Sequence, residues 1–302
     1  MIPKVKELKL IAIYLYVCQL YDIEFKYTCA RFSNNSEPVF TDQEILTIYL
    51  FAMHAEQRFK ISQIYEYADG YLRSWFPHLP SYPAFVMRIN RLSEVFKSLA
   101  INLIENFQPV DCDKQNSLLD SLPIITCSGK RKGKVAQEVT DKGYCSTKSM
   151  FYYGLKLHAL GFRRISQLPF PEEFLLTPAS ENDLNLFRQA WGGIENRVFF
   201  GDKIYHDVAY FENAFETQNS IMLTPIKGVK GQTKNIKQWD KAANDLFSTS
   251  VSKVRQPIES LFNWLIEKTD IQRASKVRST QGLMVHVFGR IAAAYIFLIF
   301  NS

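Results

Sequence analysis

Three acidic residues in this sequence have the type and spacing that metal-dependent phosphodiester chemistry requires. Asp120 and Asp202 each lie in or at the end of an apolar, strand-like run, and Glu259 lies at the start of an amphipathic segment, residues 257–268. A carboxylate in such a run is costly unless another group pairs with it. The order Asp, Asp, Glu therefore predicts carboxylates that turn toward one shared point and hold metal ions.

Each of these acids also has an ordinary structural explanation. Asp120 fits a turn or the end of a strand, and Asp202 followed by Lys203 fits a local ion pair. Glu259 fits the first turn of a helix begun by Pro257, where an acid interacts favourably with the helix dipole. The chemical interpretation depends on the three acids taken together with the elements between them.

The segment that carries Glu259 has the pattern of a helix that packs on one side. Its apolar residues recur at helical spacing: Ile258, Leu261, Phe262 and Leu265. Glu259 and Asn263 lie together on the flank of this stripe, so the helix can pack while it presents its acid. Proline disfavours helical geometry at the residue before it, so Arg255 either precedes this helix or lies beyond a kink. We expect Arg255 to contact phosphate or to form a structural ion pair.

Composition narrows the class of protein. The chain has 302 residues, 47% of them hydrophobic, with a net charge of +6 and a pI near 8.9, which permits a nucleic-acid partner without requiring one. Its five cysteines include no CxxC pair, which argues against a disulfide framework and a zinc knuckle. A reducing cytoplasm is the predicted location.

Neither end of the chain predicts a membrane segment. Residues 1–20 contain an apolar stretch, but Glu7, Lys9 and Gln19 interrupt it, which indicates an amphipathic core helix. Residues 291–300 form an unbroken apolar run, about half of the roughly 20 residues needed to span a bilayer. We expect a buried terminal helix there and no membrane partner.

The pattern of apolar residues along the sequence changes near residue 110. Residues 1–108 have helical patterns, including a capping box over residues 41–44 and helical apolar spacing over residues 83–96, and predict an all-helical domain. Aromatic residues of this part are expected in its core: Tyr65, Tyr67, Tyr71, Trp75 and Phe76. Residues 109–302 predict a second domain of mixed α/β class.

The second domain is expected to contain three consecutive strands, then helix, strand, helix, strand and a final helix. The corresponding ranges are 118–127, 151–160 and 174–178, then 182–191, 197–200, 206–218, 221–224 and 257–268. This is the succession of an RNase H-like core, in which the first strand, the end of the fourth strand and a late helix carry three metal-binding carboxylates.

The resemblance extends to specific stretches, whose joint order and spacing carry it. They are FTDQEILTIYLF at 40–51, DSLPI at 120–124, YYGLKLHAL at 152–160, GDKIY at 201–205, RQPIESLFNWL at 255–265 and VFGRIAAA at 287–294. The chain resembles an insertion-sequence transposase of the Asp-Asp-Glu (DDE) type, most closely the family called insertion sequence nine-eight-two, over nearly all of its length. Related transposases often place Tyr and Lys at set offsets from the last Glu; Ser252 and Ile266 stand there instead, so those roles are not carried over.

The resemblance implies an activity, a cofactor and partners. Asp120 would bridge two Mg²⁺ or Mn²⁺ ions, with Asp202 and Glu259 each completing one site, and hard oxygen ligands favour these metals. Water would attack the transposon end, and the freed 3′-hydroxyl would then attack target DNA. The partners would be double-stranded DNA, as terminal inverted repeats and target, and a second copy of the chain in a homodimer.

Basic residues are expected to contact DNA around the acids. Three groups stand out: Lys130, Arg131, Lys132 and Lys134; Lys156; and Lys227, Lys230, Lys234, Lys237 and Lys241. A solvated loop is the alternative for the first group. Strand alternation places Lys156 and His158 on one polar face, and His158 is either a DNA contact or a structural histidine. Lys203 and Asn263, beside two of the acids, complete this set.

Arg88 and Arg91 lie on the predicted helix after Pro83, with Asn90 and Lys97 nearby. This helix is expected to read the terminal repeats in a DNA groove, or else to be solvated on one side. Three functions remain open: a transposase, a DNA-binding relic or repressor without catalysis, and an RNase H-like nuclease without a joining step. Strand transfer of labelled repeat DNA distinguishes the first from the third.

Overall fold

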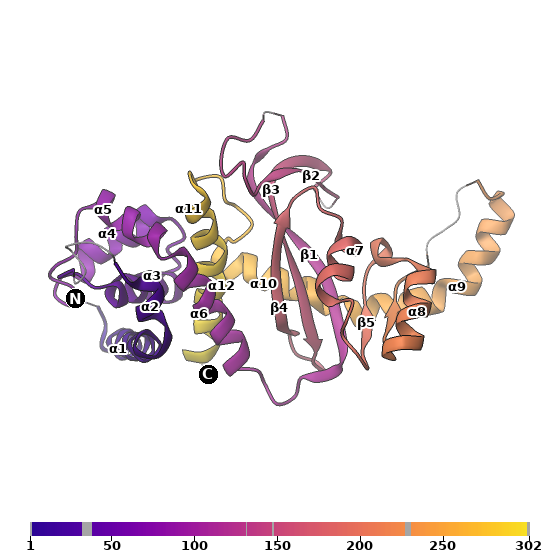
Figure 1. Cartoon of the computed structure of the whole chain (residues 1–302), viewed down its shortest axis with the longest axis horizontal. Helices are drawn as coiled ribbons and strands as arrows, with labels where there is room; N and C mark the ends of the chain where they lie inside the picture. The colour runs from indigo at the N-terminus through magenta and orange to yellow at the C-terminus, as the bar shows by residue number, and fades with distance from the viewer. Residues whose placement is uncertain (1, 32–37, 131, 147, 227–230, 301–302) are drawn as a thin grey trace. The chain divides into compact units, whose positions relative to one another are not determined.

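The computed structural model describes residues 2–31, 38–130, 132–146, 148–226 and 231–300 (Figure 1). Its contacts divide the chain into two compact units. We call residues 1–107, 134–138 and 265–302 the helical unit, and residues 108–133 and 139–264 the sheet unit. The predicted domains, 1–108 and 109–302, stay predictions, because grouping by contacts does not test independent folding.

The helical unit is built around one helix that is buried along most of its length. Its helices are α1 (Lys4–Leu20), α2 (Lys26–Cys29), α3 (Asp42–Glu56), α4 (Ile61–Tyr71), α5 (Tyr82–Arg91), α6 (Ser93–Asn106), α11 (Thr280–Met284) and α12 (Arg290–Phe300), with π-helical turns at Tyr21–Phe25 and Val285–Gly289. The predicted capping box is confirmed: the Thr41 hydroxyl accepts from the Glu44 N–H, and the Glu44 carboxylate accepts from the Thr41 N–H. These bonds fix the start of α3, whose residues 45–53 are all buried.

The C-terminal apolar run is part of this unit's core. Thr280–Phe300 is long and apolar enough to cross a bilayer by length and composition, but 72% of its most apolar window is buried inside the structure. The buried terminal helix predicted from the sequence is therefore present. At Gly289 a Cβ would lie 2.8 Å from the Tyr49 hydroxyl, so this position lets the C-terminal segment approach α3 closely.

The prediction for the aromatic residues of α4 and the following turn is only partly right. Tyr67 and Phe76 are buried, but Tyr71 and Trp75 are exposed. Tyr71 stacks on Tyr67 with ring centroids 5.2 Å apart, so it covers the core from outside. The helical period places residues 67 and 71 on one face, and a face at the edge of a core buries only part of its residues.

The sheet unit contains a six-stranded mixed sheet. Its strands are β1 (Asp113–Ser128), β2 (Asp141–Cys145), β3 (Met150–Arg163), β4 (Phe170–Pro178), β5 (Val198–Phe200) and β6 (Ile221–Leu223). The order is β2-β3-β1-β5-β6, and β4 also pairs with β3. Strands β1 to β4 pair antiparallel, whereas β5 and β6 run parallel to β1. This mixed α/β architecture is consistent with an RNase H-like core, as predicted.

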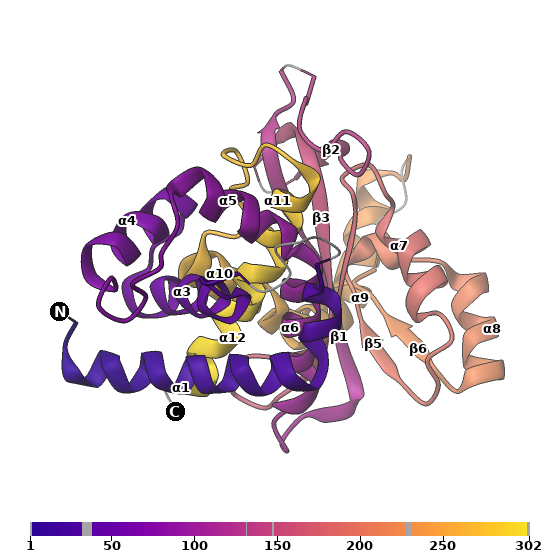
Figure 2. The ribbon, with the colours of Figure 1, turned by 60° about the vertical axis from the view of Figure 1, so that its left-hand side comes forward.

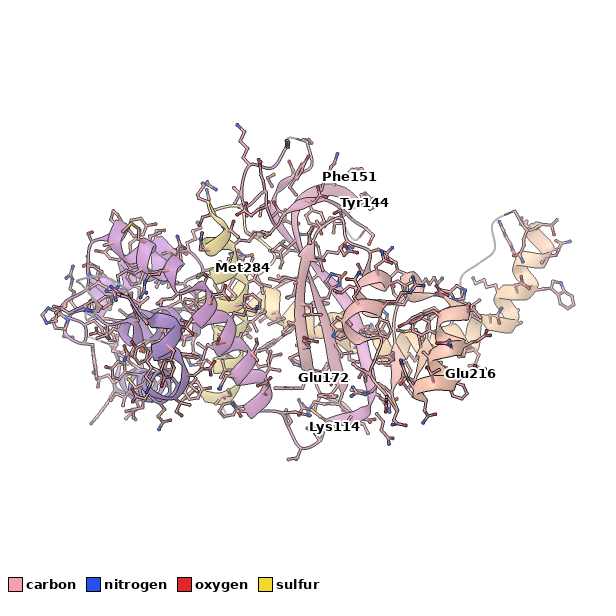
Figure 3. The ribbon with its side chains drawn as sticks, in the orientation of Figure 1. Lys114, Tyr144, Phe151, Glu172, Glu216 and Met284 are labelled. Atoms are coloured by element: carbon pink, nitrogen blue, oxygen red, sulfur yellow. The ribbon has the colours of Figure 1, made fainter. Side chains whose placement is uncertain are left out.

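Strand β2 was not predicted, because its sequence, DKGYC, has no run of apolar residues. It pairs with the first part of β3, and β4 pairs with the remainder of the same edge. The rings of Tyr144 and Phe151 meet edge to face across this pair with centroids 5.0 Å apart (Figure 3). Such cross-strand contacts stabilise a short strand that its own sequence does not specify.

The sheet unit also contains helices, of which α7 and α8 lie beside β5 and β6 (Figure 2). They are α7 (Asp183–Leu186), continued by a π-helical turn at Phe187–Trp191, then α8 (Val208–Gln218), α9 (Lys234–Arg255) and α10 (Pro257–Thr269). Phe187, Trp191, Phe199 and Phe211 form the centre of a core cluster under β1 and β5. Helix α9 was not predicted. Among its described residues only Val251 is buried, and its large apolar residues are exposed instead of packed in the core.

Candidate active site

Strand register brings the first two acids together. Strands β1 and β5 are parallel, and Leu118 is the partner of Phe200. Asp120 and Asp202 each follow these partners by two residues, so both occupy the same position at the carboxyl end of the paired segment. Beyond Phe200 strand β5 stops and β1 continues alone beside β3. Ligand sites in such sheets form outside the carboxyl ends of parallel strands.

Local structure then orients each carboxylate. The Asp120 carboxylate accepts from the Ser121 N–H at 2.8 Å. Asp202 caps a short 3₁₀ turn and accepts from the Ile204 N–H at 2.9 Å. Gly201 is required at the preceding position, because a Cβ there would lie 2.7 Å from the Tyr205 ring.

Arg255 connects Asp120 to the third acid. Its guanidinium donates to Asp120 Oδ2 at 2.8 Å and to Glu259 Oε1 at 2.5 Å. Arg255 ends α9, and Gln256 stays helical with φ −47° and ψ −35° despite the following proline. Arg255 thus lies before α10, at the end of the preceding helix α9, which is one of the two predicted positions. Helix α9 packs against both β1 and β5. The predicted apolar stripe of α10 is buried, and Glu259 and Asn263 are exposed.

The acids and Arg255 change one another's pKa values. The pKa of Asp120 is raised to about 6, mainly by burial and to a smaller extent by Asp202 and Glu259, although Arg255 and the Ser121 N–H oppose the shift. Burial also raises the pKa of Asp202, although the Ile204 N–H and Arg255 act to lower it. Burial lowers the pKa of Arg255, but Asp120 and Glu259 more than offset this, so its pKa is raised. Because burial and mutual repulsion disfavour the ionised form of these carboxylates, a nearby positive charge stabilises that form.

The residues present fit a divalent metal by the chemistry of their donors. Three carboxylates supply the hard oxygen ligands that Mg²⁺ and Mn²⁺ prefer. Within the part of the chain that the structure describes, no three His, Cys, Asp or Glu side chains already form a cluster that could hold a metal ion. The cation that joins Asp120 to Glu259 in this conformation is the Arg255 guanidinium.

A family model described as the transposase DDE domain matches residues 112–297. The chain belongs to the DDE transposase family. No curated protein and no solved structure matches it. The match covers the strands and helices that carry all three acids; membership of this family implies DNA binding, and DDE transposase domains generally use divalent metal ions.

Sequence reasoning missed a fourth carboxylate beside the site. Asp183 is 6% exposed and accepts from the Ser121 hydroxyl and from the Lys156 ammonium, both at 2.7 Å. Lys156 also donates to the Glu181 carbonyl at 2.7 Å. The available signal was the helix-capping Asn182 before Asp183, which does not by itself indicate a contact with residue 121.

The residues predicted to contact DNA near the acids differ in how far they are buried. Lys156 is held by Asp183, and His158 is fully buried with Nε2 2.8 Å from the Thr177 hydroxyl, which favours the structural-histidine alternative. Lys203 and Asn263 are exposed. Their contacts with DNA stay predictions.

Arg88 and Arg91 of the helical unit converge on one buried carboxylate. Asp42, 4% exposed, accepts from Arg88 at 2.8 Å, Arg91 at 2.5 Å and Arg31 at 2.9 Å. Both predicted recognition residues therefore support the fold in this conformation, and their reading of DNA stays a prediction.

The lysine groups predicted to bind DNA are exposed where they are described. These residues are Lys130, Lys132, Lys134, Lys234, Lys237 and Lys241. The last three lie on α9, and Figure 1 shows the N-terminal end of that helix extending beyond α8. Arg131, Lys227 and Lys230 lie outside the described residues.

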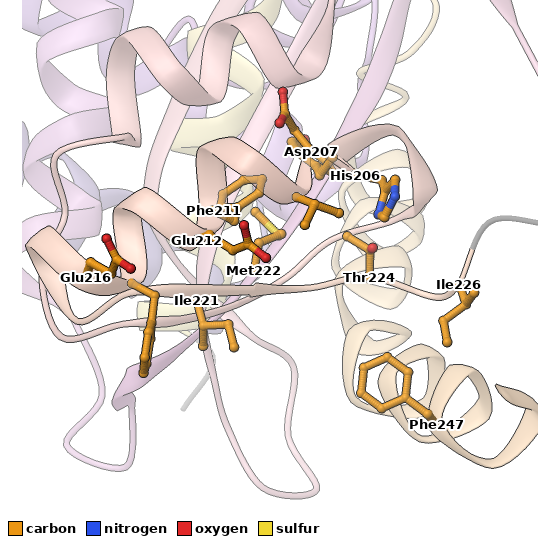
Figure 4. Close-up of a pocket in the computed structure, with 13 residues that line it drawn as sticks. His206, Asp207, Phe211, Glu212, Glu216, Ile221, Met222, Thr224, Ile226 and Phe247 are labelled. Carbon is orange, nitrogen blue, oxygen red and sulfur yellow. The ribbon is translucent and has the colours of Figure 1, made fainter.

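A pocket of about 420 Å³ lies next to the site between α8, β6 and α9 (Figure 4). Phe211, Ile221, Met222 and Phe247 are apolar residues of its lining, which also includes Asp207 and Glu212. None of the three acids lines it, so it is distinct from the carboxylate site.

Proposed function

We propose that this DDE transposase cleaves DNA at the ends of an insertion sequence and joins those ends to target DNA, with Asp120, Asp202 and Glu259 as its catalytic and metal-binding residues. The supporting observation is the register of β1 and β5, which aligns Asp120 with Asp202, together with the Arg255 bridge from Asp120 to Glu259. The sequence resemblance supports assignment to the insertion sequence nine-eight-two family.

The three acids would hold two Mg²⁺ or Mn²⁺ ions. When bound, such a pair stabilises negative charge on the attacking and leaving oxygens of an in-line displacement. The chain's own contribution is to fix the ligands: two at the ends of paired strands and one on a packed helix. Arg255, Lys203 and Asn263 lie next to these acids in the chain or in space and would contact phosphates, which position DNA without reading its sequence.

The proposed sequence of reactions uses one site twice. Water first attacks the phosphodiester at the transposon end, which frees a 3′-hydroxyl group. That hydroxyl then attacks a phosphodiester of target DNA and releases one strand of it. Both steps are displacements at phosphorus, so the same arrangement of carboxylates serves each.

A homodimer in the cytoplasm, associated with the nucleoid, is part of this proposal. Helix α9 exposes an apolar side: Ile236 is 50%, Trp239 80%, Leu246 80% and Phe247 44% exposed. At about 200 Å² for an aromatic side chain, these four expose on the order of 500 Å², against about 800 Å² per partner in a standard interface. We place the contact with the second copy at this side of α9.

Cleavage and strand transfer of terminal-repeat DNA test the proposal. The native chain with Mg²⁺ or Mn²⁺ should cut the repeat and join it to a second duplex, and Asp120→Ala, Asp202→Ala and Glu259→Ala should each bind DNA without cutting it. Cutting without joining would support a nuclease. Tight binding without cutting by the native chain would support a silent DNA-binding protein.

A further inference from the structure

The carboxylate site rests on a buried polar layer that connects it to α7 and to the turn after β5. Asp183 is the centre of this layer, because it joins Lys156 on β3 to Ser121 on β1. Ser121 donates its backbone N–H to Asp120 and its hydroxyl to Asp183. The carboxylate of Asp120 is therefore connected through one residue to a buried ion pair.

Tyr205 lies in the same layer and has a polar group without a partner. Its side chain is 1% exposed, and its hydroxyl makes no hydrogen bond to any residue that the structure describes. The ring is fixed from two sides: it meets Phe187 at 6.2 Å between centroids, and Gly201 leaves the space it fills. A buried hydroxyl without a hydrogen bond costs about 1–3 kcal/mol, so its retention requires an explanation.

Three acids of the site act electrostatically on that hydroxyl. Burial raises the pKa of Tyr205 well above its usual value, and Asp183, Asp120 and Asp202 raise it further, in that order. The phenol therefore keeps its proton at neutral pH and is a donor beside three acceptors.

We propose that Asp183 and Tyr205 are positioning residues of this active site: Asp183, held by Lys156, orients Asp120 through Ser121, and the Tyr205 hydroxyl donates a hydrogen bond to the site's carboxylates when a metal ion is bound. The inference rests on the proposed function, because it assigns metal binding to Asp120 and Asp202. Groups that orient metal ligands commonly change metal affinity about 10- to 100-fold when they are lost.

The first test is calorimetric titration of the full-length protein with Mn²⁺ alone, together with its thermal unfolding midpoint. Tyr205→Phe deletes only the hydroxyl group and should weaken Mn²⁺ binding about tenfold without lowering the midpoint. The matched control is Tyr49→Phe, a buried tyrosine of the helical unit whose hydroxyl lies 3.4 Å from the Val285 carbonyl. It should leave Mn²⁺ affinity unchanged.

A single variant and a charge-neutral double variant distinguish a positioning role of Asp183 from simple structural support. Asp183→Asn leaves the half-buried Lys156 without its ion-pair partner and should lower both stability and Mn²⁺ affinity. The double variant Asp183→Asn with Lys156→Met removes that unpaired charge and should recover stability but not affinity. Ser121→Ala keeps the backbone N–H bond to Asp120 but removes the hydroxyl bond to Asp183, so it should also weaken Mn²⁺ binding.

The outcomes separate this inference from the proposed function. Recovery of both stability and affinity in the double variant, or native affinity in Tyr205→Phe, would overturn the positioning role while Asp120→Asn still abolished Mn²⁺ binding. Failure of the native protein to bind Mn²⁺ would overturn both proposals.

Discussion

Replacing Arg255 with glutamine should make the transposase bind a divalent cation more tightly. The Arg255 guanidinium occupies Asp120 Oδ2 at 2.8 Å and Glu259 Oε1 at 2.5 Å, and its side chain is only 16% exposed. A metal ion that uses those oxygens must first displace both contacts. Glutamine keeps some of the length and polarity but carries no charge, so this competition disappears.

The size of the effect follows from the two contacts. A hydrogen bond between charged groups contributes about 1.5–3 kcal/mol to stability when it is sheltered, as for Asp120. Half of the Glu259 side chain is exposed, so its pair with Arg255 contributes less than about 1 kcal/mol. Removing Arg255 also raises the pKa of Asp120, which offsets part of the gain. A net change of about 1.5–2 kcal/mol corresponds to roughly 10- to 30-fold tighter binding.

Calorimetric titration with Mn²⁺ near pH 8 measures this change directly. Arg197→Gln is the matched control, because Arg197 pairs with Glu172 at 2.7 Å in the same unit and contacts none of the three acids. Mn²⁺ affinity that is weaker than native in Arg255→Gln would refute the reasoning, since it would show that Arg255 supports the metal ligands instead of competing for them.

Three further predictions concern stability, pH and assembly. Asp42→Asn leaves three arginines around a buried neutral side chain and should lower the free energy of unfolding by about 3–5 kcal/mol; denaturant unfolding should show less than about 1 kcal/mol for Asp69→Asn, which breaks an exposed pair. Burial lowers the pKa of His54 to about 4 from 6.5, so the unfolded chain binds the extra proton first and stability should fall by about 2–3 kcal/mol as pH drops from 6.5 to 4. Urea titrations across this range should show a shallower loss for His54→Gln, and an unchanged slope would contradict the assignment. Trp239→Ser with Leu246→Ser should shift the native chain from dimer to monomer in sedimentation, and a persistent dimer would place the contact elsewhere.

Local patterns in the sequence were sufficient for the parts of the fold that depend on periodicity. The capping box of α3, the buried stripe of α10, and most strands and helices of the sheet unit follow from apolar spacing within ten or so residues. Strand β2 and helix α9 were not predicted, because β2 has no run of apolar residues and the apolar side of α9 is exposed instead of packed in a core. Their stability depends on pairing with β3 and on packing of one end against β1 and β5.

The three candidate acids were proposed from the sequence, and their role stays a prediction, but their surroundings were decided by tertiary structure. Arg255 contacts Asp120 across 135 positions, and Asp183 meets Ser121 across 62. Composition and spacing marked Arg88, Arg91 and His158 as polar and therefore as candidates for DNA, whereas the folded chain turns the first two toward Asp42 and buries the third beside Thr177. A side chain's type sets which partners it can accept, but only the packing of distant segments decides which partner it meets, because burial removes water as the alternative.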